Sequence, residues 1–315
     1  VLFTILFVLY PVTEAFASNL TNPIKIGVLY WSSNIPGQVA MAEGLEAEAE
    51  KINKNATKHG LPAVELITKV AGDGQLGIEN QIQQMNEMIH LKPDVIIVQP
   101  ADNAALAAPL LVANRADIPV VAYDQYISGG HLAAYLTSDN HQAGYLDGEY
   151  VASLFENKKT IRLILVEYPL VSSTVERTNG FLDALHDQQQ SYTILKTYQA
   201  VEFMSGLKAG QDILNDFPEK NSVDVIFTVN DGGGLSVVNV LAKAGRTEIV
   251  VASVDGDPES VENIKNNRLT HIDTAQFCGP LGAEAIKTAY SIARDLEVKK
   301  QVLIPVFPIT SETLS

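Results

Sequence analysis

Strand-like and helix-like segments alternate along nearly the whole chain, and this alternation limits the folds open to it. Each short run rich in β-branched residues is followed by a segment in which apolar residues recur at helical spacing. The strand-like runs lie at residues 24–31, 64–70, 94–100, 118–124, 161–168, 192–198, 223–229 and 248–254. Repeated strand–helix units are typical of parallel sheets with helices packed on both faces.

The composition of the strand-like runs also indicates sheets that are covered on both faces. Apolar residues follow one another in these runs, as in buried parallel strands, instead of alternating with polar ones. A chain of 315 residues is longer than one hydrophobic core usually organises. We therefore predict an α/β protein with two doubly wound parallel-sheet lobes, joined by a short ordered connection near residues 133–140. Helices are expected near 38–53, 76–89, 104–114, 174–185, 204–217 and 234–244.

The first seventeen residues differ from the rest and predict a secretory signal peptide. An almost wholly apolar run is interrupted by Pro11, and Ala15-Phe16-Ala17 forms an A-x-A cleavage signal before polar Ser18. The run is shorter than the about 20 apolar residues that a transmembrane helix needs. No cysteine follows it to carry a lipid anchor. We expect residues 1–17 to be cleaved after Ala17 and the protein to diffuse freely in a bacterial periplasm.

The charge balance argues against nucleic acid as a partner. The chain has 22 basic and 37 acidic residues and a net charge of −15, whereas nucleic-acid binding depends on Lys and Arg that neutralise phosphates. An acidic surface mainly favours solubility. The single cysteine, Cys278, cannot form an internal disulfide, so the stability of the fold must come from packed cores. We expect a monomer.

Three of the strand-like runs end in a carboxylate or carboxamide. Asp124 ends one run, Asn230 and Asp231 end a second, and Asp255 ends a third. In open α/β sheets, ligands bind in the crevice beyond the carboxyl ends of the strands, so these side chains are predicted to converge on one small polar molecule. The alternative for each position is a turn or helix cap, because Asp and Asn favour both.

Longer segments of the chain resemble a known family. They are IPVVAYD, TSDNHQAGYLDGEY, ERTNGF, VIFTVNDGGGLSVVNVLAKAG and IVVASVDGDPESVENIKNNRLTHIDTAQ. In order and spacing they are similar to the type I periplasmic binding proteins, above all the ribose-binding branch, which is related to the ligand-binding cores of lactose-repressor-type regulators. The resemblance covers nearly all of the chain from Pro23 onward. It implies a multi-strand hinge, one lobe from 23–137 with 277–305, and a second lobe from 138–276 with 306–315.

The resemblance also implies which residues contact the ligand. By position in the family motifs, Asp124, Arg177, Asn230, Asp255 and Gln276 match residues that hold a sugar between the two lobes. The chemistry of these side chains fits such a role. Ionised carboxylates accept hydrogen bonds from neighbouring hydroxyls, and Arg offers a planar fork of donors.

The chain departs from the ribose binders at four positions of this predicted site. Gly37 and Gln38 stand in place of two phenylalanines, Gln125 in place of an arginine, and Val201 in place of an aromatic residue. These differences weaken the case for ribose as the ligand.

An aromatic stacking surface must therefore come from elsewhere in the chain. Trp31, at the end of the first strand-like run, is the leading candidate, and its alternative is an ordinary core position. Tyr126, Tyr168 and Phe203 are further aromatic candidates, and Asn34 in the first loop completes the predicted site.

Signals for an enzyme, a cofactor or a metal are weak. The six histidines and Cys278 show no metal-ligand spacing, and no G-x-S-x-G elbow is present. The segment 72–77 fits G-x-G-x-x-G, but it follows the second strand-like run and no acidic residue ends the next one. Asp124 and Asp255 could form a glycosidase pair, yet with Arg177 nearby both should stay ionised, which suits hydroxyl binding better than proton donation. We expect no cofactor and no bound metal.

The function implied by the resemblance is that of a non-enzymatic periplasmic receptor. It would capture a monosaccharide or similar polyol between two lobes and deliver it to a membrane ABC importer. The alternative is a ligand sensor that signals to a chemoreceptor or a histidine kinase.

Overall fold

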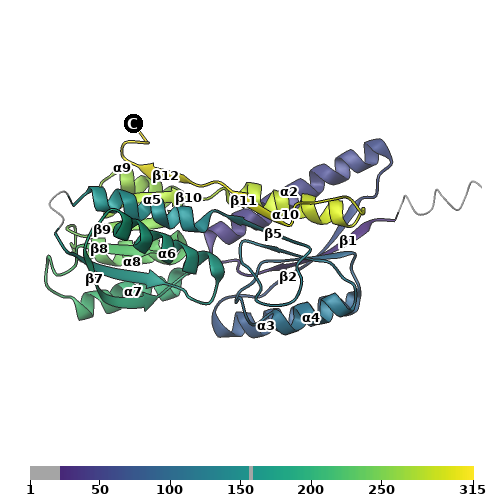
Figure 1. The fold of residues 1–315 in the computed structure, drawn as a ribbon, viewed down its shortest axis with the longest axis horizontal. Coiled ribbons are helices and arrows are strands. Elements are labelled where there is room, and N and C mark those ends of the chain that lie inside the picture. The colour runs from purple at the N-terminus through teal and green to yellow at the C-terminus, as the bar shows by residue number, and fades with distance from the viewer. Residues whose placement is uncertain (1–21, 156–158) are drawn as a thin grey trace, which may run out of the picture.

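The computed structural model describes residues 22–155 and 159–315 and contains two six-stranded sheets with helices on their faces (Figure 1). The α/β fold class predicted from the sequence is confirmed. The predicted signal peptide, 1–17, lies outside the described residues. No described helix is long and apolar enough to span a bilayer.

The first sheet has the strand order β11-β5-β4-β3-β1-β2, and all of its pairings are parallel. Its strands are β1 (Ile24–Tyr30), β2 (Val64–Val70), β3 (Val95–Val98), β4 (Val120–Tyr123), β5 (Ala134–Ser138) and β11 (Gln301–Ile304). One face packs on α2 (Pro36–His59) and α10 (Cys278–Ile292), and the other on α3 (Gly74–Leu91) and α4 (Ala107–Arg115). We call these elements the first lobe.

The second sheet has the order β12-β10-β9-β8-β6-β7 and is parallel except for β12, which runs antiparallel to β10. Its strands are β6 (Ile161–Glu167), β7 (Tyr192–Gln199), β8 (Val225–Thr228), β9 (Val250–Asp255), β10 (Thr270–Ala275) and β12 (Phe307–Thr310). The helices are α5 (Asn140–Ser153), α6 (Ser172–Asp187), α7 (Phe203–Asp216), α8 (Asp231–Lys243) and α9 (Pro258–Lys265). Helices α5 and α6 cover one face, and α7 and α8 cover the other. We call these elements the second lobe.

Burial on both sheet faces explains the continuous apolar runs of the strands. Successive side chains of a strand point to opposite faces. Val28 of β1 accordingly belongs to the core beneath α2 and α10, whereas Leu29 belongs to the core beneath α3 and α4. In β6, Ile164 and Leu165 divide in the same way between the two cores of the second lobe. An alternating polar pattern would have placed polar groups in one of the two cores.

Glycines allow the helices that carry the site to pack with their backbones in contact. A methyl group at Gly144 of α5 would overlap the carbonyl oxygen of Arg177 in α6, and one at Gly180 of α6 would overlap that of His141 in α5. Interiors packed this closely resist small changes of volume. The contact therefore fixes the turn of α6 from which Arg177 projects.

The chain passes between the lobes three times, from β5 to α5, from β10 to α10 and from β11 to β12. The segment 133–140, expected to be only a connection, forms β5, which pairs with both β4 and β11. This strand was not predicted because its run, AYLTS, is short and only partly apolar. The lobe boundaries 23–137 with 277–305 and 138–276 with 306–315 stay a prediction.

Candidate functional site

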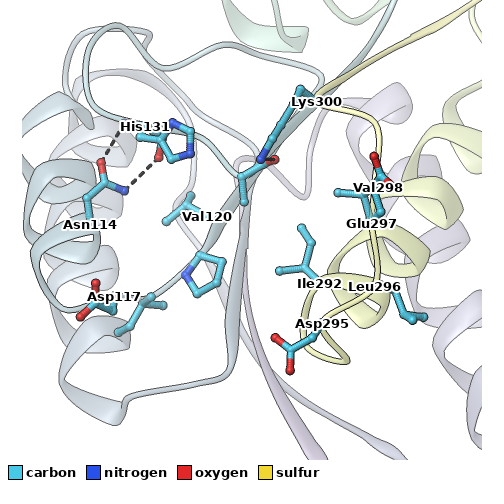
Figure 2. Close-up of a pocket in the computed structure, with 13 residues that line it drawn as sticks. Asn114, Asp117, Val120, His131, Ile292, Asp295, Leu296, Glu297, Val298 and Lys300 are labelled. Atoms are coloured by element: carbon cyan, nitrogen blue, oxygen red, sulfur yellow. Dashed lines mark hydrogen bonds between the residues drawn. The ribbon is translucent and has the colours of Figure 1, made fainter.

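A wide cavity lies away from every residue predicted to bind ligand. It has a volume of about 760 Å³ and lies beside the amino ends of β4, β5 and β11, between the ends of α4 and α10 (Figure 2). Its polar lining includes Asn114, His131 and Lys300 with scattered acidic groups, open to solvent. Ligands of open α/β sheets bind at the opposite, carboxyl ends of the strands, so cavity size alone does not identify the site here.

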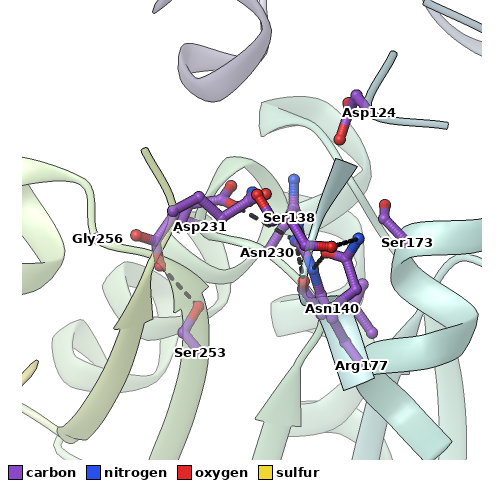
Figure 3. A network of polar contacts seen from close by, with 12 residues as sticks. Asp124, Ser138, Asn140, Ser173, Arg177, Asn230, Asp231, Ser253 and Gly256 are labelled. Atoms are coloured by element: carbon purple, nitrogen blue, oxygen red, sulfur yellow. Dashed lines mark hydrogen bonds and ion pairs between the residues drawn. The ribbon is translucent and has the colours of Figure 1, made fainter. Parts of the chain in front are cut away.

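A smaller cavity at the carboxyl ends of the strands brings most of the predicted residues together. It lies between the lobes and measures about 20 Å³, hardly more than one water molecule occupies. Six of the nine predicted residues line it: Trp31, Asp124, Arg177, Asn230, Asp255 and Gln276. Figure 3 shows Asp124 on one side of the cleft, with Arg177, Asn140 and Asn230 across from it. We call this the cleft site.

Asp124 directly follows β4 and is 1% exposed. Its Oδ2 accepts hydrogen bonds from Gln38 Nε2 at 2.9 Å and from Gln99 Nε2 at 3.2 Å. Burial raises the pKa of Asp124, and the positive charge of Arg177 together with these amide donors opposes that shift. The carboxylate is therefore held in place by neutral donors of its own lobe.

Asp255, at the end of β9, is held by a different set of donors. Its Oδ1 accepts from Arg177 Nη1 at 3.1 Å and from Gln276 Nε2 at 2.5 Å. Arg177 is 3% exposed and also donates from Nη1 to the carbonyl oxygen of Val229 at 2.8 Å and from Nε to Asn140 Oδ1 at 2.9 Å. A buried ion pair is tolerated when its remaining donors and acceptors are satisfied in this way.

Both cleft aspartates have strained backbones. Asp124 has φ 65° and Asp255 has φ 140°, a region that side-chain-bearing residues seldom adopt. Such conformations cost on the order of 1–3 kcal/mol and persist where the surrounding structure enforces them, often at ligand sites. Neither carboxylate caps a helix. The next helix after Asp124 is α5, which begins at Asn140, and the helix after Asp255 is α9, which begins after Asp257. The capping alternative therefore does not account for these two positions.

Asn230 matches the helix-cap alternative, whereas the side chain of Asp231 lies in the core of its own lobe. Asn230 caps α8, because its Oδ1 accepts from the backbone N–H of Gly233 at 3.2 Å, although its side chain also lines the cleft site. Asp231 is buried away from the cavity, where its carboxylate accepts from Ser253 Oγ at 2.6 Å and from the backbone N–H of Asp257 at 2.9 Å. Asp231 therefore lies outside the proposed ligand contacts.

Two other predicted residues also lie outside the lining. Asn34 donates from Nδ2 to Asp73 Oδ2 at 2.7 Å in an exposed loop contact. Tyr168 stacks on Trp31 with ring centroids 6.0 Å apart and an interplanar angle of 23°. Of the four aromatic candidates, Trp31 alone lines the cavity, while Tyr126 and Phe203 are exposed.

Several polar residues of the cleft site were not predicted from the sequence. Gln99 donates to Asp124 from behind the cavity lining, and it follows β3 as Asp124 follows β4, so the same strand-end rule would have identified it. Gln38 stands where the ribose binders have a phenylalanine, yet it lines the cavity and donates to Asp124. Ser173, at the second position of α6, carried no signal in the sequence.

Hinge residues join the two aspartates through a chain of hydrogen bonds. Thr137 Oγ1 donates to the carbonyl oxygen of Asp124 at 2.9 Å, and Asn140 Nδ2 donates to Thr137 Oγ1 at 2.9 Å. Asn140 Oδ1 then accepts from Arg177, which binds Asp255. The positions of the two carboxylates are thus linked through the first crossing between the lobes.

The lobes also meet directly at the rim of the cavity. Gln125 Nε2 donates to Ser173 Oγ at 2.8 Å, and the backbone N–H of Ser173 donates to Gln125 Oε1 at 3.0 Å. Beside them, an apolar cluster that includes Trp31 and Ile35 of the first lobe packs on Val171 and Val201 of the second. The structure is therefore a closed arrangement, and a molecule of several carbon atoms enters only when these contacts separate.

Asp255 in the cleft site and Asp257 behind it predict how the stability of the protein depends on pH. Burial raises the pKa of Asp255 to about 6 and that of Asp257 to about 7, from 3.8 in each case. A carboxyl group whose pKa is raised by folding contributes its full stabilisation of the folded protein below about pH 4. This contribution is lost as the pH rises through 6 and 7. Burial lowers the pKa of His271, which acts in the opposite direction.

The Asp255→Asn variant isolates the contribution of Asp255. In urea titrations at matched ionic strength, the unliganded wild type should gain stability relative to this variant between about pH 7.5 and about pH 5.5. An equal pH dependence of the two proteins would show that Asp255 titrates normally.

Comparison with known proteins agrees with this architecture. The family described as periplasmic binding protein domain matches residues 26–297. The chain is 24% identical over 285 residues to the ribose import binding protein RbsB of Escherichia coli strain K12, which covers 90% of this chain and 89% of that protein. It is 26% identical over 302 residues to the protein of the same name from Bacillus subtilis strain 168, covering 94% and 91%.

Solved structures give the same result for the fold. An ABC transporter solute binding protein from Bacillus halodurans C-125 with bound myo-inositol has a TM-score of 0.80 at 24% identity, covering 93% of this chain and 96% of that one. The Caulobacter myo-inositol binding protein bound to myo-inositol has a TM-score of 0.78 at 23% identity, covering 92% and 94%. Because the family match extends over both sheets and most of the sequence, the chain belongs to the family of periplasmic binding protein domains.

Proposed function

We propose that the protein is a periplasmic solute-binding protein that captures a monosaccharide or similar polyol between its lobes and delivers it to an ABC importer. The observation that carries this proposal is a pair of buried acceptors without donors. Gln38 Oε1 and Gln276 Oε1 have no hydrogen-bond partner, and both side chains line the cleft site. Buried polar atoms normally have partners, and the hydroxyl groups of a polyol would supply the missing donors.

The carboxylates of the cleft site also favour a ligand that carries several hydroxyl groups. Asp124 and Asp255 reach the cavity from different lobes, and carboxylates accept hydrogen bonds from vicinal hydroxyls. Trp31 offers an apolar face for the C–H surface of a sugar ring or cyclic polyol. The relatives named above are ribose import proteins, and the similar structures hold myo-inositol. Both relatives take part in import, and the Bacillus halodurans protein belongs to an ABC transporter, which favours delivery to an importer over signalling.

Binding would proceed by opening and closing of the lobes about the three crossings. In the open form, solvent reaches Asp124 on the first lobe and the Arg177–Asp255 pair on the second. Closure around the ligand would bring both sets of polar groups onto it and present one joined surface to the membrane partner. The aspartates serve as acceptors and carry out no reaction in this proposal.

Export would remove residues 1–17 by cleavage after Ala17. The mature protein would act as a monomer whose lobes divide at the boundaries predicted from the sequence.

A thermal-shift screen of pentoses, hexoses and cyclic and linear polyols tests the function. A ligand at a hundred times its Kd stabilises by about 2.7 kcal/mol, so a true ligand should raise the melting temperature by several degrees. With that ligand, Trp31 fluorescence should change, and small-angle scattering should show a radius of gyration that differs between the free and saturated protein. Absence of any stabilising polyol would contradict the proposal, and tight binding with an unchanged radius would contradict closure.

A further inference from the structure

The charges that line the cleft site do not balance. Two carboxylates, Asp124 and Asp255, face one guanidinium, Arg177. Arg177 forms its ion pair with Asp255 at 3.1 Å. In the part of the chain that the structure describes, Asp124 forms no ion pair, and the neutral amides of Gln38 and Gln99 donate to it. A buried carboxylate without a cationic partner is costly.

More carboxylates lie directly behind Asp255. Asp231 and Asp273 are almost fully buried, and Asp257 is half-buried. The backbone N–H of Gly256 donates to Asp273 at 3.0 Å, so this carboxylate lies against the turn that follows Asp255. These groups repel one another, and Arg177 is the cation whose charge acts on both Asp255 and Asp273. Burial and mutual repulsion raise the pKa of Asp231 and Asp273, so the negative potential of the cavity comes mainly from Asp124 on one lobe and Asp255 on the other.

The hydrogen-bonding capacity of the cavity is also unbalanced. Gln38 turns its amide nitrogen to Asp124 and Gln276 turns its own to Asp255, which leaves both amide oxygens as buried acceptors without partners. The Nε and Nη1 donors of Arg177 are already used by Asn140, Val229 and Asp255. The oxygens of Gln38 and Gln276 and the carboxylate of Asp124 therefore all accept hydrogen bonds in this cavity, which favours a ligand that supplies donors and positive charge.

We propose that the ligand is a polyol that carries a protonated amine, an amino sugar or an amino cyclitol, with its ammonium group beside Asp124. This inference rests on the proposed function and names the chemical class within it. An ammonium group has three donors and no acceptor, so it suits Asp124 and the free oxygen of Gln38 together. It supplies the missing positive charge, and Trp31 in the same cavity offers an aromatic face that attracts cations.

Matched pairs of ligands test the proposal. Each pair consists of a polyol and the analogue in which one hydroxyl is replaced by an amine, such as glucose and glucosamine, galactose and galactosamine, glucitol and 1-amino-1-deoxyglucitol, and inositols with their inosamines. Binding is measured by calorimetry at about pH 7.5, where these amines are largely protonated. In at least one pair the amine should bind about tenfold more tightly or better, because a charge-assisted hydrogen bond replaces a neutral one.

The Asp124→Asn variant tests where the amine lies. It keeps the size of the side chain but removes its charge, so the affinity ratio of amine to hydroxyl analogue should fall to about one. The matched control is Asp295→Asn, because Asp295 lines the large cavity at the other end of the first lobe. In this control the affinity ratio of amine to hydroxyl analogue should equal that of the wild type. An unchanged ratio would exclude a general effect of net charge.

The outcomes separate this inference from the proposed function. Neutral polyols that bind as tightly as or more tightly than their amines in every pair would overturn the inference and leave the polyol receptor intact. An amine preference that survives Asp124→Asn would also overturn the placement beside Asp124. If no member of any pair binds, the proposed function fails together with the inference.

Discussion

Replacing Arg177 with methionine is expected to lower the free energy of unfolding by about 3–5 kcal/mol and to abolish ligand binding. Arg177 is 3% exposed and donates to Asn140, Val229 and Asp255 at once. Methionine fills much of the volume, but it leaves one buried carboxylate without its cation and two buried oxygens without donors. Breaking a buried ion pair by removing one partner has a cost of this size. Urea denaturation measures the first effect, and calorimetry with the identified ligand measures the second.

A surface variant supplies the control for this experiment. Lys208→Met removes an exposed ion pair with Asp212, four positions along α7, and should change the free energy of unfolding by less than about 0.5 kcal/mol. The difference in the free energy of unfolding between the wild type and Arg177→Met should also become smaller toward about pH 5, because Asp255 then takes up a proton. If Arg177→Met lowered the free energy of unfolding as little as Lys208→Met does, the buried network would contribute little to folding.

Asp255→Asn should weaken ligand binding by about tenfold or more without lowering the stability of the unliganded protein. A hydrogen bond to a charged group contributes about 1.5–3 kcal/mol, and 1.4 kcal/mol corresponds to a factor of ten in affinity. The unliganded protein loses the attraction to Arg177, but the repulsion from Asp257 and Asp273 disappears at the same time. Calorimetry gives the affinity, and thermal unfolding without ligand gives the stability.

An aspartate with a purely structural role gives the opposite pattern. Asp94 accepts a hydrogen bond from the backbone N–H of Lys25 at 2.7 Å, beside the amino end of β3. Asp94→Ala should lower stability by about 1 kcal/mol and leave the affinity unchanged. If Asp255→Asn behaved like Asp94→Ala, Asp255 would be a turn residue and the proposed cleft site would be wrong.

The alternation of apolar runs and helical spacing was enough to predict two parallel-sheet lobes. Local periodicity carries this information, because side chains of a strand alternate between its faces while those of a helix recur every three to four residues. Another local rule, that ligands lie beyond the carboxyl ends of strands, identified Asp124, Asn230 and Asp255 as candidate ligand contacts. The expected helices are present, although α2 extends from Pro36 to His59, well beyond the predicted end near Asn53.

Local patterns could not show which neighbouring polar residue faces the cleft. Asn230 and Asp231 are adjacent in sequence, but the first is the cap of α8 and the second its first helical residue, so their side chains leave the backbone in different directions. Asn230 consequently lines the cavity, whereas Asp231 points to Ser253 in the core of its own lobe. The direction of a side chain depends on how the helix starts and on what packs against it.

The partners of the two cleft aspartates were decided by the tertiary structure alone. Gln38 and Asp124 are 86 positions apart, and Arg177 and Asp255 are 78 apart. These contacts form only when the sheets place the strand ends together and when Gly144 lets α5 and α6 approach closely enough to position Arg177. The sequence by itself determined the layered α/β architecture and the strand ends at which polar groups gather, because both depend on short-range periodicity. Which of those groups are paired, which are left without donors, and where the unbalanced negative charge lies were set by long-range packing, because hydrogen bonds and burial depend on residues that meet only in the folded chain.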